Sequence, residues 1–314
     1  MTTPALLRVF LVISQVAFAV SCARSQQQSE DFARASLEHI RVLAADSLQG
    51  RETGTPGNRM AQEYIEQEFR AAGLAPVDSG YRHAFTLTKD EATVHGVNLI
   101  GLIRGTKYPD RAIVITAHYD HVGVRDGQIY NGADDNASGV AGLLAAAHWF
   151  RRHAPATTLI FAALDAEEKG LLGATALLKH PPVPLEQIRL NINLDMISRS
   201  SKKELYAAGT AHYPWLKPLL TSVARPDSLR LLFGHDTPEH GAQHDWTLAS
   251  DHGVFHQHGI PFIYFGVEDH EDYHKPSDDF SKTDRAFFID AVHFITRAIA
   301  KLDAYIARDP SPQR

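Results

Sequence analysis

Hydrophobic residues change their spacing along the chain, and the change predicts two kinds of structure. From residue 31 to residue 73 they recur every three or four positions, which predicts two amphipathic helices. The first carries Leu37 and Ile40 on its apolar face, and the second begins at Thr55 and ends at Gly73. We therefore expect two helices before the first strand of a sheet.

After residue 96, short apolar runs alternate with longer helical stretches. The strands are expected at 97–103, 112–117, 158–164, 188–194, 204–207, 230–233 and 262–265. The helices are expected at 137–152, 171–180, 215–223 and 284–306, and the polar, His-rich segment 234–258 is expected to be a loop. Strands that are apolar almost throughout are buried on both faces. The pattern predicts an α/β fold in a single domain, with a mixed, mostly parallel, twisted sheet and helices on both faces.

Composition narrows the class of protein. The chain has 314 residues, of which 44% are hydrophobic, and this is enough for one large core. A net charge of −6 without a Lys/Arg block gives no support for a nucleic-acid partner. The single cysteine excludes intrachain disulfides and thiolate zinc sites. Eight of the 18 histidines lie between His235 and His274, which directs the search to metal binding.

The first 22 residues resemble an export signal. Arg8 precedes an apolar run over residues 9–20, which is long enough for a signal peptide and short for a membrane span. The run ends in a sequence that resembles a bacterial lipobox, with Cys22 as the lipidated residue; cleavage after Ala19 would instead give a soluble secreted protein. We expect residues 1–22 to be a signal peptide, 23–30 a tether and 31–310 the folded domain. The expected location is the periplasm or the outer membrane.

Side chains suited to metal binding follow four of the expected strands. His118-Tyr119-Asp120 follows the strand at 112–117, and Asp165-Ala166-Glu167-Glu168 follows the strand at 158–164. Asp195 follows the strand at 188–194, and Tyr273-His274 lies in the loop after the last strand. A further pair, Asp134-Asp135, lies in a Gly-flanked turn before a helix. Sites in open α/β sheets form beyond the carboxyl ends of the strands, so we expect these groups to converge.

Each of these groups has an ordinary structural explanation when it is taken alone. A carboxylate after a strand often caps a helix, and adjacent glutamates often form a solvated turn. Several carboxylates at one buried site, however, repel one another and raise each other's pKa. Divalent cations remove that cost, and zinc accepts mixed nitrogen and oxygen ligands. The combination predicts a metal site.

Five ordered motifs resemble one known family. They are His118-Tyr119-Asp120, the segment 132–139 (GADDNASG), the segment 164–168 (LDAEE), Asn193-Leu194-Asp195 and Tyr273-His274. They are similar to motifs of the di-zinc exopeptidases of the bacterial leucyl-type aminopeptidase family, whose relatives include glutamate carboxypeptidases and glutaminyl cyclases. The resemblance extends over about residues 35–305 and implies a zinc peptidase catalytic domain acting on peptide substrates.

The resemblance implies a role for each motif residue. The implied ligands of two Zn²⁺ ions, with Co²⁺ or Mn²⁺ as alternatives, are His118, Asp134, Glu168, Asp195 and His274, with Asp134 shared by both ions. Glu167 is implied as the general base, Asp120 as the group that orients His118, and Tyr273 as the donor to the oxyanion. A cis peptide bond is expected between Asp134 and Asp135.

Three alternatives to an aminopeptidase stay open. The carboxypeptidases share the implied metal core, but the chain lacks the large insertion that they often carry, which favours an aminopeptidase. A glutaminyl cyclase would be a single-zinc acyltransferase with similar motifs. A lipoprotein that binds metal or peptide without turnover would not need Glu167.

Two local patterns point to other enzymes. His270-Glu271-Asp272-Tyr273-His274 fits the H-E-x-x-H pattern of single-zinc metalloproteases, but Pro276 would end the helix that this pattern requires. Ser250-Asp251-His252 contains the residue types of a serine-hydrolase triad, whose members come from distant segments. We interpret the second pattern as part of a pocket wall.

Overall fold

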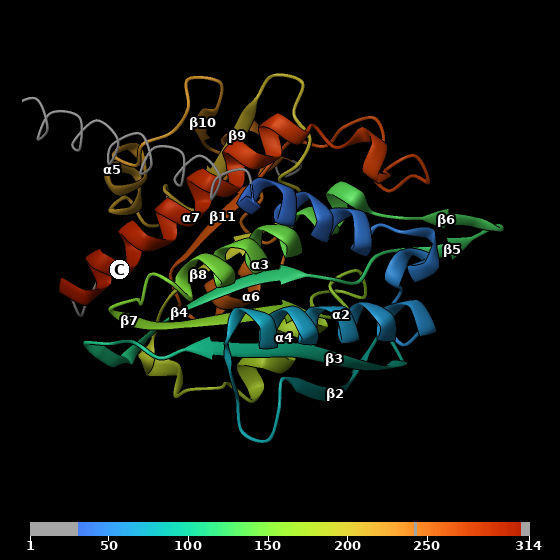
Figure 1. Cartoon of the computed structure of the whole chain (residues 1–314), viewed down its shortest axis with the longest axis horizontal. Helices are drawn as coiled ribbons and strands as arrows, with labels where there is room; N and C mark the ends of the chain where they lie inside the picture. Colours follow the sequence, from blue (N-terminus) through green and yellow to red (C-terminus); the bar gives the residue numbers. More distant parts are fainter. Residues whose placement is uncertain (1–30, 242–243, 309–314) are drawn as a thin grey trace, which may run out of the picture.

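The computed structural model describes residues 31–241 and 244–308, and Figure 1 shows their arrangement. The predicted signal peptide, the tether and Cys22 lie outside the described residues. Within the described part, no helix combines the length and the apolar character needed to cross a membrane.

A nine-stranded mixed sheet forms the centre of the fold (Figure 1). Its order is β1-β3-β7-β4-β8-β11-β9-β10, and β2 also pairs with β3. The strands are β1 (Ala75–Pro76), β2 (Arg82–Lys89), β3 (Ala92–Ile103), β4 (Tyr108–His118), β7 (Thr157–Leu164), β8 (Ile188–Leu194), β9 (Glu204–Ala208), β10 (Arg230–Phe233) and β11 (Phe262–Gly266). A separate hairpin contains β5 (Gly123–Arg125) and β6 (Gln128–Tyr130).

Four neighbouring strands at the centre, β7, β4, β8 and β11, are parallel. Their carboxyl ends therefore meet at one edge of the sheet. The pairs β1–β3, β2–β3, β3–β7 and β9–β11 are antiparallel. The predicted mixed, mostly parallel sheet is thus confirmed for the core of the fold.

Helices lie on both faces of the sheet, as predicted (Figure 1). Besides the helical residues 31–43, they are α2 (Pro56–Ala72), α3 (Gly139–Phe150), α4 (Leu172–Lys179), α5 (Leu216–Thr221), α6 (His252–Gln257) and α7 (Arg285–Arg308). Short 3-10 turns cover Asp46–Arg51, Leu185–Gln187, Pro238–His240 and Phe280–Lys282. Thr55 caps α2 and Gly73 ends it with a φ of 72°, as the sequence predicts.

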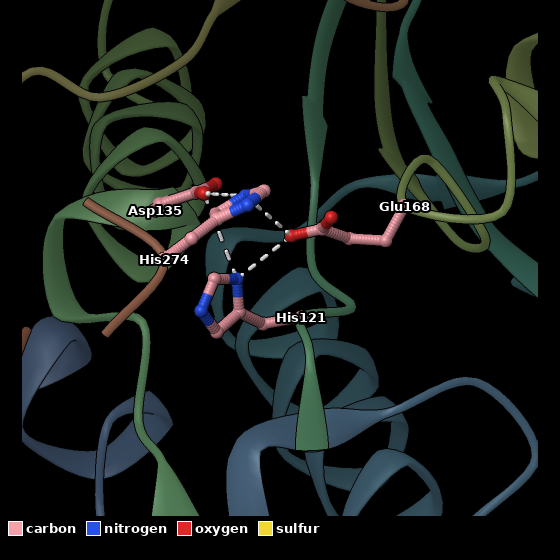
Figure 2. Close-up of side chains that lie close together, drawn as sticks. All are labelled: His121, Asp135, Glu168 and His274. Atoms are coloured by element: carbon pink, nitrogen blue, oxygen red, sulfur yellow. Dashed lines mark ion pairs between the residues drawn. The ribbon is translucent and has the colours of Figure 1, made fainter. Parts of the chain in front are cut away.

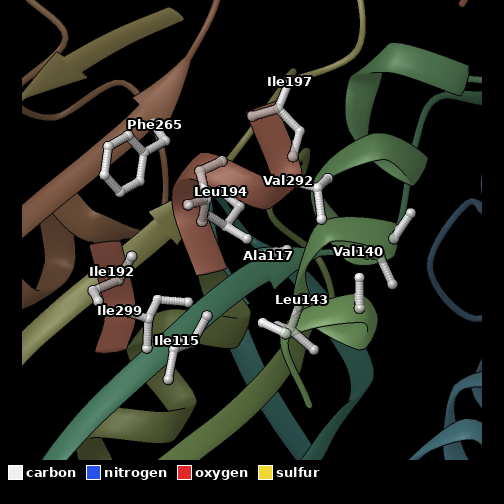
Figure 3. Close-up of a cluster of buried hydrophobic side chains, with 14 of the residues drawn as sticks. Ile115, Ala117, Val140, Leu143, Ile192, Leu194, Ile197, Phe265, Val292 and Ile299 are labelled. Carbon is white, nitrogen blue, oxygen red and sulfur yellow. The ribbon is translucent and has the colours of Figure 1, made fainter. Parts of the chain in front are cut away.

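The strand side chains alternate between two hydrophobic clusters, one on each face of the sheet. Ile113 and Ile115 of β4 pack in the larger cluster with α3 and α7, and Figure 3 shows Ile115 there with Leu143 and Val292. Val114, between them, packs in the smaller cluster with residues of α4 and α6. This alternation is the period of two of a strand that is buried on both faces.

The fold differs from the prediction in its smaller strands and in one loop. The short strands β1, β5 and β6 were not predicted, nor was β2, whose alternate residues are half-buried and include few that are strongly apolar. The segment 234–258 is not all loop, since α6 lies within it. Val254 and Phe255 pack that short helix on the smaller cluster.

Candidate metal centre

The candidate site lies at the carboxyl ends of the four parallel central strands. His118 is the last residue of β4, Asp195 directly follows β8, and Glu167 and Glu168 follow β7 after two residues. His274 lies in the loop after β11 and has a φ of 51°. A cavity of about 350 Å³ opens among these side chains, which confirms the predicted convergence.

The possible ligands form two groups that share one carboxylate. The three-residue cluster consists of His118, Asp135 and Asp195; the four-residue cluster consists of His121, Asp135, Glu168 and His274 (Figure 2). In each cluster the ligand atoms all lie within 4.8 Å of one another. The sequence predicted all of these residues as ligands except His121 and Asp135.

Asp135 places one oxygen in each cluster. Its Oδ1 lies 3.4 Å from Nε2 of His118, and its Oδ2 lies 3.0 Å from Nε2 of His274. Nε2 of His118 is also 3.3 Å from Oδ1 of Asp195. The side chain of Asp135 is therefore placed as a bridging carboxylate would be.

Asp134, which the resemblance implied as the shared ligand, lies outside both clusters. Its Oδ1 accepts hydrogen bonds from the backbone N–H of Ser198 at 2.7 Å and from the Ser198 hydroxyl at 2.8 Å. Its Oδ2 lies 3.1 Å from Nε2 of His270. The expected cis peptide bond is also displaced by one residue, to Asp135–Asn136. Asp135 takes the position predicted for Asp134.

His121 was not predicted as a ligand, and no neighbouring residue was predicted in its place. Its Nδ1 lies 2.9 Å from Oε1 of Glu168 and 3.7 Å from Oδ2 of Asp135. The side chain is completely buried. The sequence carried one signal, a second histidine three residues after His118, but nothing in the spacing shows that its ring points to the same site.

Asp120 has a different contact from the one predicted. Its carboxylate accepts hydrogen bonds from the backbone N–H groups of Glu167 at 3.1 Å and of Glu168 at 3.3 Å. Nδ1 of His118 lies 3.2 Å from the backbone oxygen of Asp120, whereas the carboxylate is 3.7 Å away. Asp120 thus holds the turn that carries the two glutamates, and its main chain orients His118.

The electrostatics of the site reflect buried carboxylates in close contact. Burial raises the pKa of Glu167 well above its usual value, and the neighbouring Asp251 and Asp195 raise it further against the effect of His118. Burial also opposes ionisation of Glu168, but the neighbouring imidazoles of His121 and His274 outweigh it and lower that pKa. The two adjacent glutamates therefore have opposite tendencies to hold a proton.

Tyr273 lines the cavity beside His274. Its ring stacks on the imidazole with centroids 4.1 Å apart. Burial raises the pKa of Tyr273, and the carboxylates of Asp135 and Asp195 act in the same direction. The phenol thus keeps its proton and can donate a hydrogen bond.

The residues present fit a pair of divalent cations. Zinc bonds of about 2.0–2.1 Å in tetrahedral geometry place neighbouring ligand atoms about 3.3 Å apart. The nitrogen–oxygen separations among the ligand atoms of the two clusters, 2.9 to 3.7 Å, bracket that value. Oε1 of Glu168, Oδ1 of Asp195 and both ring nitrogens of His121 are buried without a hydrogen-bond partner. Buried polar atoms rarely lack partners, and cations would supply them.

The two competing local patterns are not supported by the geometry. Residues 271–274 form turns, and His270 and His274 contact different carboxylates, Asp134 and Asp135. Nε2 of His252 bonds the backbone oxygen of Trp246, and the Asp251 carboxylate has no hydrogen-bond partner. Neither arrangement is a metalloprotease helix or a serine triad.

The sequence of the chain is similar to a known family and to curated relatives. The sequence model of Peptidase family M28 matches residues 98–299. The Bacillus subtilis protein "Aminopeptidase YwaD" is 31% identical over 218 residues, which are 64% of this chain and 44% of that protein. The chain spans about half the length of the curated relatives it matches.

Solved structures share the fold at low sequence identity. A zinc aminopeptidase from Bacillus subtilis has a TM-score of 0.66 and 19% identity, with 86% of this chain and 95% of the other covered. The glutaminyl cyclase of Porphyromonas gingivalis has a TM-score of 0.70 and 19% identity, with 86% and 98% covered. An aminopeptidase and a cyclase are thus equally similar in fold, so the fold does not separate their reactions.

Proposed function

Because the chain belongs to Peptidase family M28, we propose that it is a two-zinc aminopeptidase that removes N-terminal residues from peptides. The observation that carries the proposal is the position of Asp135, whose two oxygens face separate ligand clusters beside Glu167. Two cations held there would activate a water and polarise the scissile carbonyl. Zinc fits the ligand set, with Co²⁺ and Mn²⁺ as alternatives.

The protein's own groups would move the proton and bind the oxyanion. Glu167 is adjacent to the ligand Glu168 but belongs to neither cluster, and its carboxylate lines the cavity. It can therefore accept a proton from the attacking water and deliver it to the leaving amine. Tyr273 lines the same cavity, and its hydroxyl can donate a hydrogen bond to the developing oxyanion.

The charge of the cavity favours an amino-terminal substrate. Its described lining includes the carboxylates of Glu167 and Asp269 in addition to those of Asp135, Glu168 and Asp195, but no lysine or arginine. A carboxypeptidase needs a cationic group for the C-terminal carboxylate of its substrate, and arginine suits this task best. An N-terminal ammonium group, in contrast, would be attracted to Glu167 and Asp269, the lining carboxylates that belong to neither cluster.

One preparation of the full chain tests the proposal. Metal per chain is measured, and the release of p-nitroaniline from leucine p-nitroanilide is followed before chelation, after chelation and after zinc is returned. We expect two metals, loss of activity on chelation and recovery with zinc. Acetyl-leucine p-nitroanilide is the matched substrate without an ammonium group and should not be cleaved. One metal per chain, together with cyclisation of N-terminal glutamine, would instead identify a cyclase.

Export is part of the proposal but depends on residues outside the described structure. The resemblance of residues 19–22 to a lipobox supports an anchor at Cys22. Expression of the full chain and a Cys22→Ala variant in a bacterium, followed by separation of membrane and soluble fractions, tests it. A Cys22→Ala variant that stays in the membrane fraction would argue against lipidation.

A further inference from the structure

His121 has no hydrogen-bond partner although its side chain is completely buried. Neither ring nitrogen accepts or donates a hydrogen bond, and the same holds for Oε1 of Glu168, which lies 2.9 Å from Nδ1. A buried polar atom left without a partner costs about 1–3 kcal/mol. The arrangement is therefore costly unless something else binds these atoms.

Nδ1 of His121 completes a set of four ligand atoms. It lies 2.9 Å from Glu168 and 3.7 Å from Asp135, and Nε2 of His274 lies 3.4 Å and 3.0 Å from the same two carboxylates. Figure 2 shows the two imidazoles and the two carboxylates facing a common centre. The four separations bracket the edge of about 3.3 Å expected for a tetrahedron around zinc.

We propose that His121 is a fourth protein ligand of the cation in the four-residue cluster. This cation would then have all four tetrahedral positions occupied by protein, whereas the cation of His118, Asp135 and Asp195 would have three protein ligands. Closed four-ligand sites are typical of structural zinc, and three-ligand sites keep a position open for water or substrate. The inference rests on the proposed two-metal site, and it assigns different tasks to the two cations.

A simpler explanation is a buried ion pair between His121 and Glu168. An ion pair at this depth is favourable only with good hydrogen-bond geometry. The contact does not provide it, because neither Nδ1 nor Oε1 has a hydrogen bond. A metal ion, in contrast, needs the lone pair of the imidazole to point at the centre and no proton between the ligands.

The surrounding backbone restricts rotation of the His121 ring. Gly132 has a φ of 54°, and a Cβ atom built there would lie 2.5 Å from Cδ2 of His121. The ring of His274 lies across it, with centroids 5.6 Å apart and an interplanar angle of 65°. The imidazole is thus fixed in the orientation that places Nδ1 among the other three ligand atoms. Ligands that are fixed before binding lose little freedom when the cation enters.

Two consequences follow from unequal ligand sets. The four-residue cluster should bind its cation more tightly, because one more protein ligand contributes to the affinity. The three-residue cluster should present the open position, so the substrate carbonyl is expected beside His118 and Asp195 rather than beside His121. Partial chelation should therefore remove the cation of the three-residue cluster first.

A pair of matched variants of the full chain tests the assignment by calorimetry. Metal-free wild type is titrated with Zn²⁺ in the presence of a competing chelator, which resolves a tight and a weaker binding step. His121→Asn should weaken the tight step by about 100-fold or more, since even loss of a group behind a ligand costs 10–100-fold. His118→Asn should weaken or remove the weaker step and leave the tight one unchanged.

The proposal would be overturned if both Zn²⁺ binding steps were unchanged in His121→Asn, or if only the weaker step were affected. Thermal unfolding of the metal-free variants shows whether each is folded. If His121→Asn is not folded, the visible absorption of the Co²⁺-loaded wild type tests the coordination number instead. Four-coordinate Co²⁺ absorbs far more strongly than six-coordinate Co²⁺. Two weakly absorbing six-coordinate ions would then overturn it.

This test is independent of the peptidase assay. Two binding steps with the expected response to His121→Asn would support the ligand assignment even if no aminoacyl substrate were cleaved. Cleavage of leucine p-nitroanilide with unchanged zinc binding in His121→Asn would support the peptidase and reject the assignment.

Discussion

Asp134 and Asp135 are neighbours in the chain, but their carboxylates have separate partners. Asp134 accepts hydrogen bonds from the backbone N–H and hydroxyl of Ser198, whereas Asp135 faces His118 with one oxygen and His274 with the other. Asp278 accepts hydrogen bonds from the backbone N–H groups of both residues and fixes the turn between them. The turn thus uses one carboxylate to hold the loop after β8 and offers the other to metal.

This division predicts different results for two conservative substitutions. Asp135→Asn removes the charge shared by both clusters, so the number of tightly bound metals should fall from two to at most one. Asp134→Asn should keep both metals but lose about 1–3 kcal/mol of unfolding free energy, because an acceptor of buried hydrogen bonds is weakened. Elemental analysis and denaturant unfolding measure the two effects. Loss of metal in Asp134→Asn with full retention in Asp135→Asn would reverse the assignment.

The sequence predicted the location of the site better than the identity of its metal ligands. Runs such as Phe262–Gly266 are apolar throughout, so their strands were clear, and parallel strands bring their ends to one edge. The choice between Asp134 and Asp135 depends on the direction of the backbone within one turn. His121 lies beyond the end of β4, where packing against Gly132 and the ring of His274 fixes its imidazole. Such orientations result from tertiary contacts that a single sequence does not contain.

Glu167 is expected to be essential for turnover and unnecessary for metal binding. Glu167→Gln keeps the size of the side chain but cannot take a proton, so turnover should fall by about 10²–10⁴-fold. Metal content and KM for leucine p-nitroanilide should stay close to those of the wild type. The exposed Glu186 provides the matched control, and Glu186→Gln should have wild-type kinetics. A Glu167→Gln variant with wild-type turnover would show that another group is the base.

Arg51 is expected to stabilise the fold around the site. It is completely buried and donates hydrogen bonds to the backbone oxygens of Leu43, Tyr119, Asn131 and Gly132. These bonds join the first described helix to the segments that carry His121 and Asp135. Arg51→Met leaves the four oxygens without that donor and should cost about 3 kcal/mol or more.

The unfolding temperature of metal-free protein measures this effect. A loss of about 3 kcal/mol corresponds to a decrease of about 6–12 °C in a domain of this size. Arg59 donates one hydrogen bond to the backbone oxygen of Gly54 from an exposed position. Arg59→Met should change the unfolding temperature by no more than about 1–2 °C. Equal shifts for the two variants would mean that the buried bonds of Arg51 contribute little.

His39 is expected to make the stability of the protein sensitive to acid. Burial lowers its pKa from 6.5 to about 4, and the nearby His148 acts in the same direction. The carboxylates of Glu68 and Glu38 oppose this shift but do not outweigh it. Its Nδ1 lies 2.7 Å from the Tyr64 hydroxyl. Between pH 6.5 and about 4 the unfolded chain holds a proton at this position that the folded chain does not. The stabilisation is therefore complete above pH 6.5 and is lost as the pH falls to 4.

The loss should be about 3 kcal/mol, since each pH unit contributes about 1.4 kcal/mol over this interval. His39→Gln can still bond Tyr64 but does not titrate, so its unfolding free energy should fall less than that of the wild type between pH 7 and pH 4. Urea unfolding of the metal-free proteins at several pH values measures the difference. His153→Gln, at an exposed imidazole, is the matched control and should follow the wild type. Parallel curves for wild type and His39→Gln would show that His39 is protonated in the folded protein as readily as in the unfolded chain.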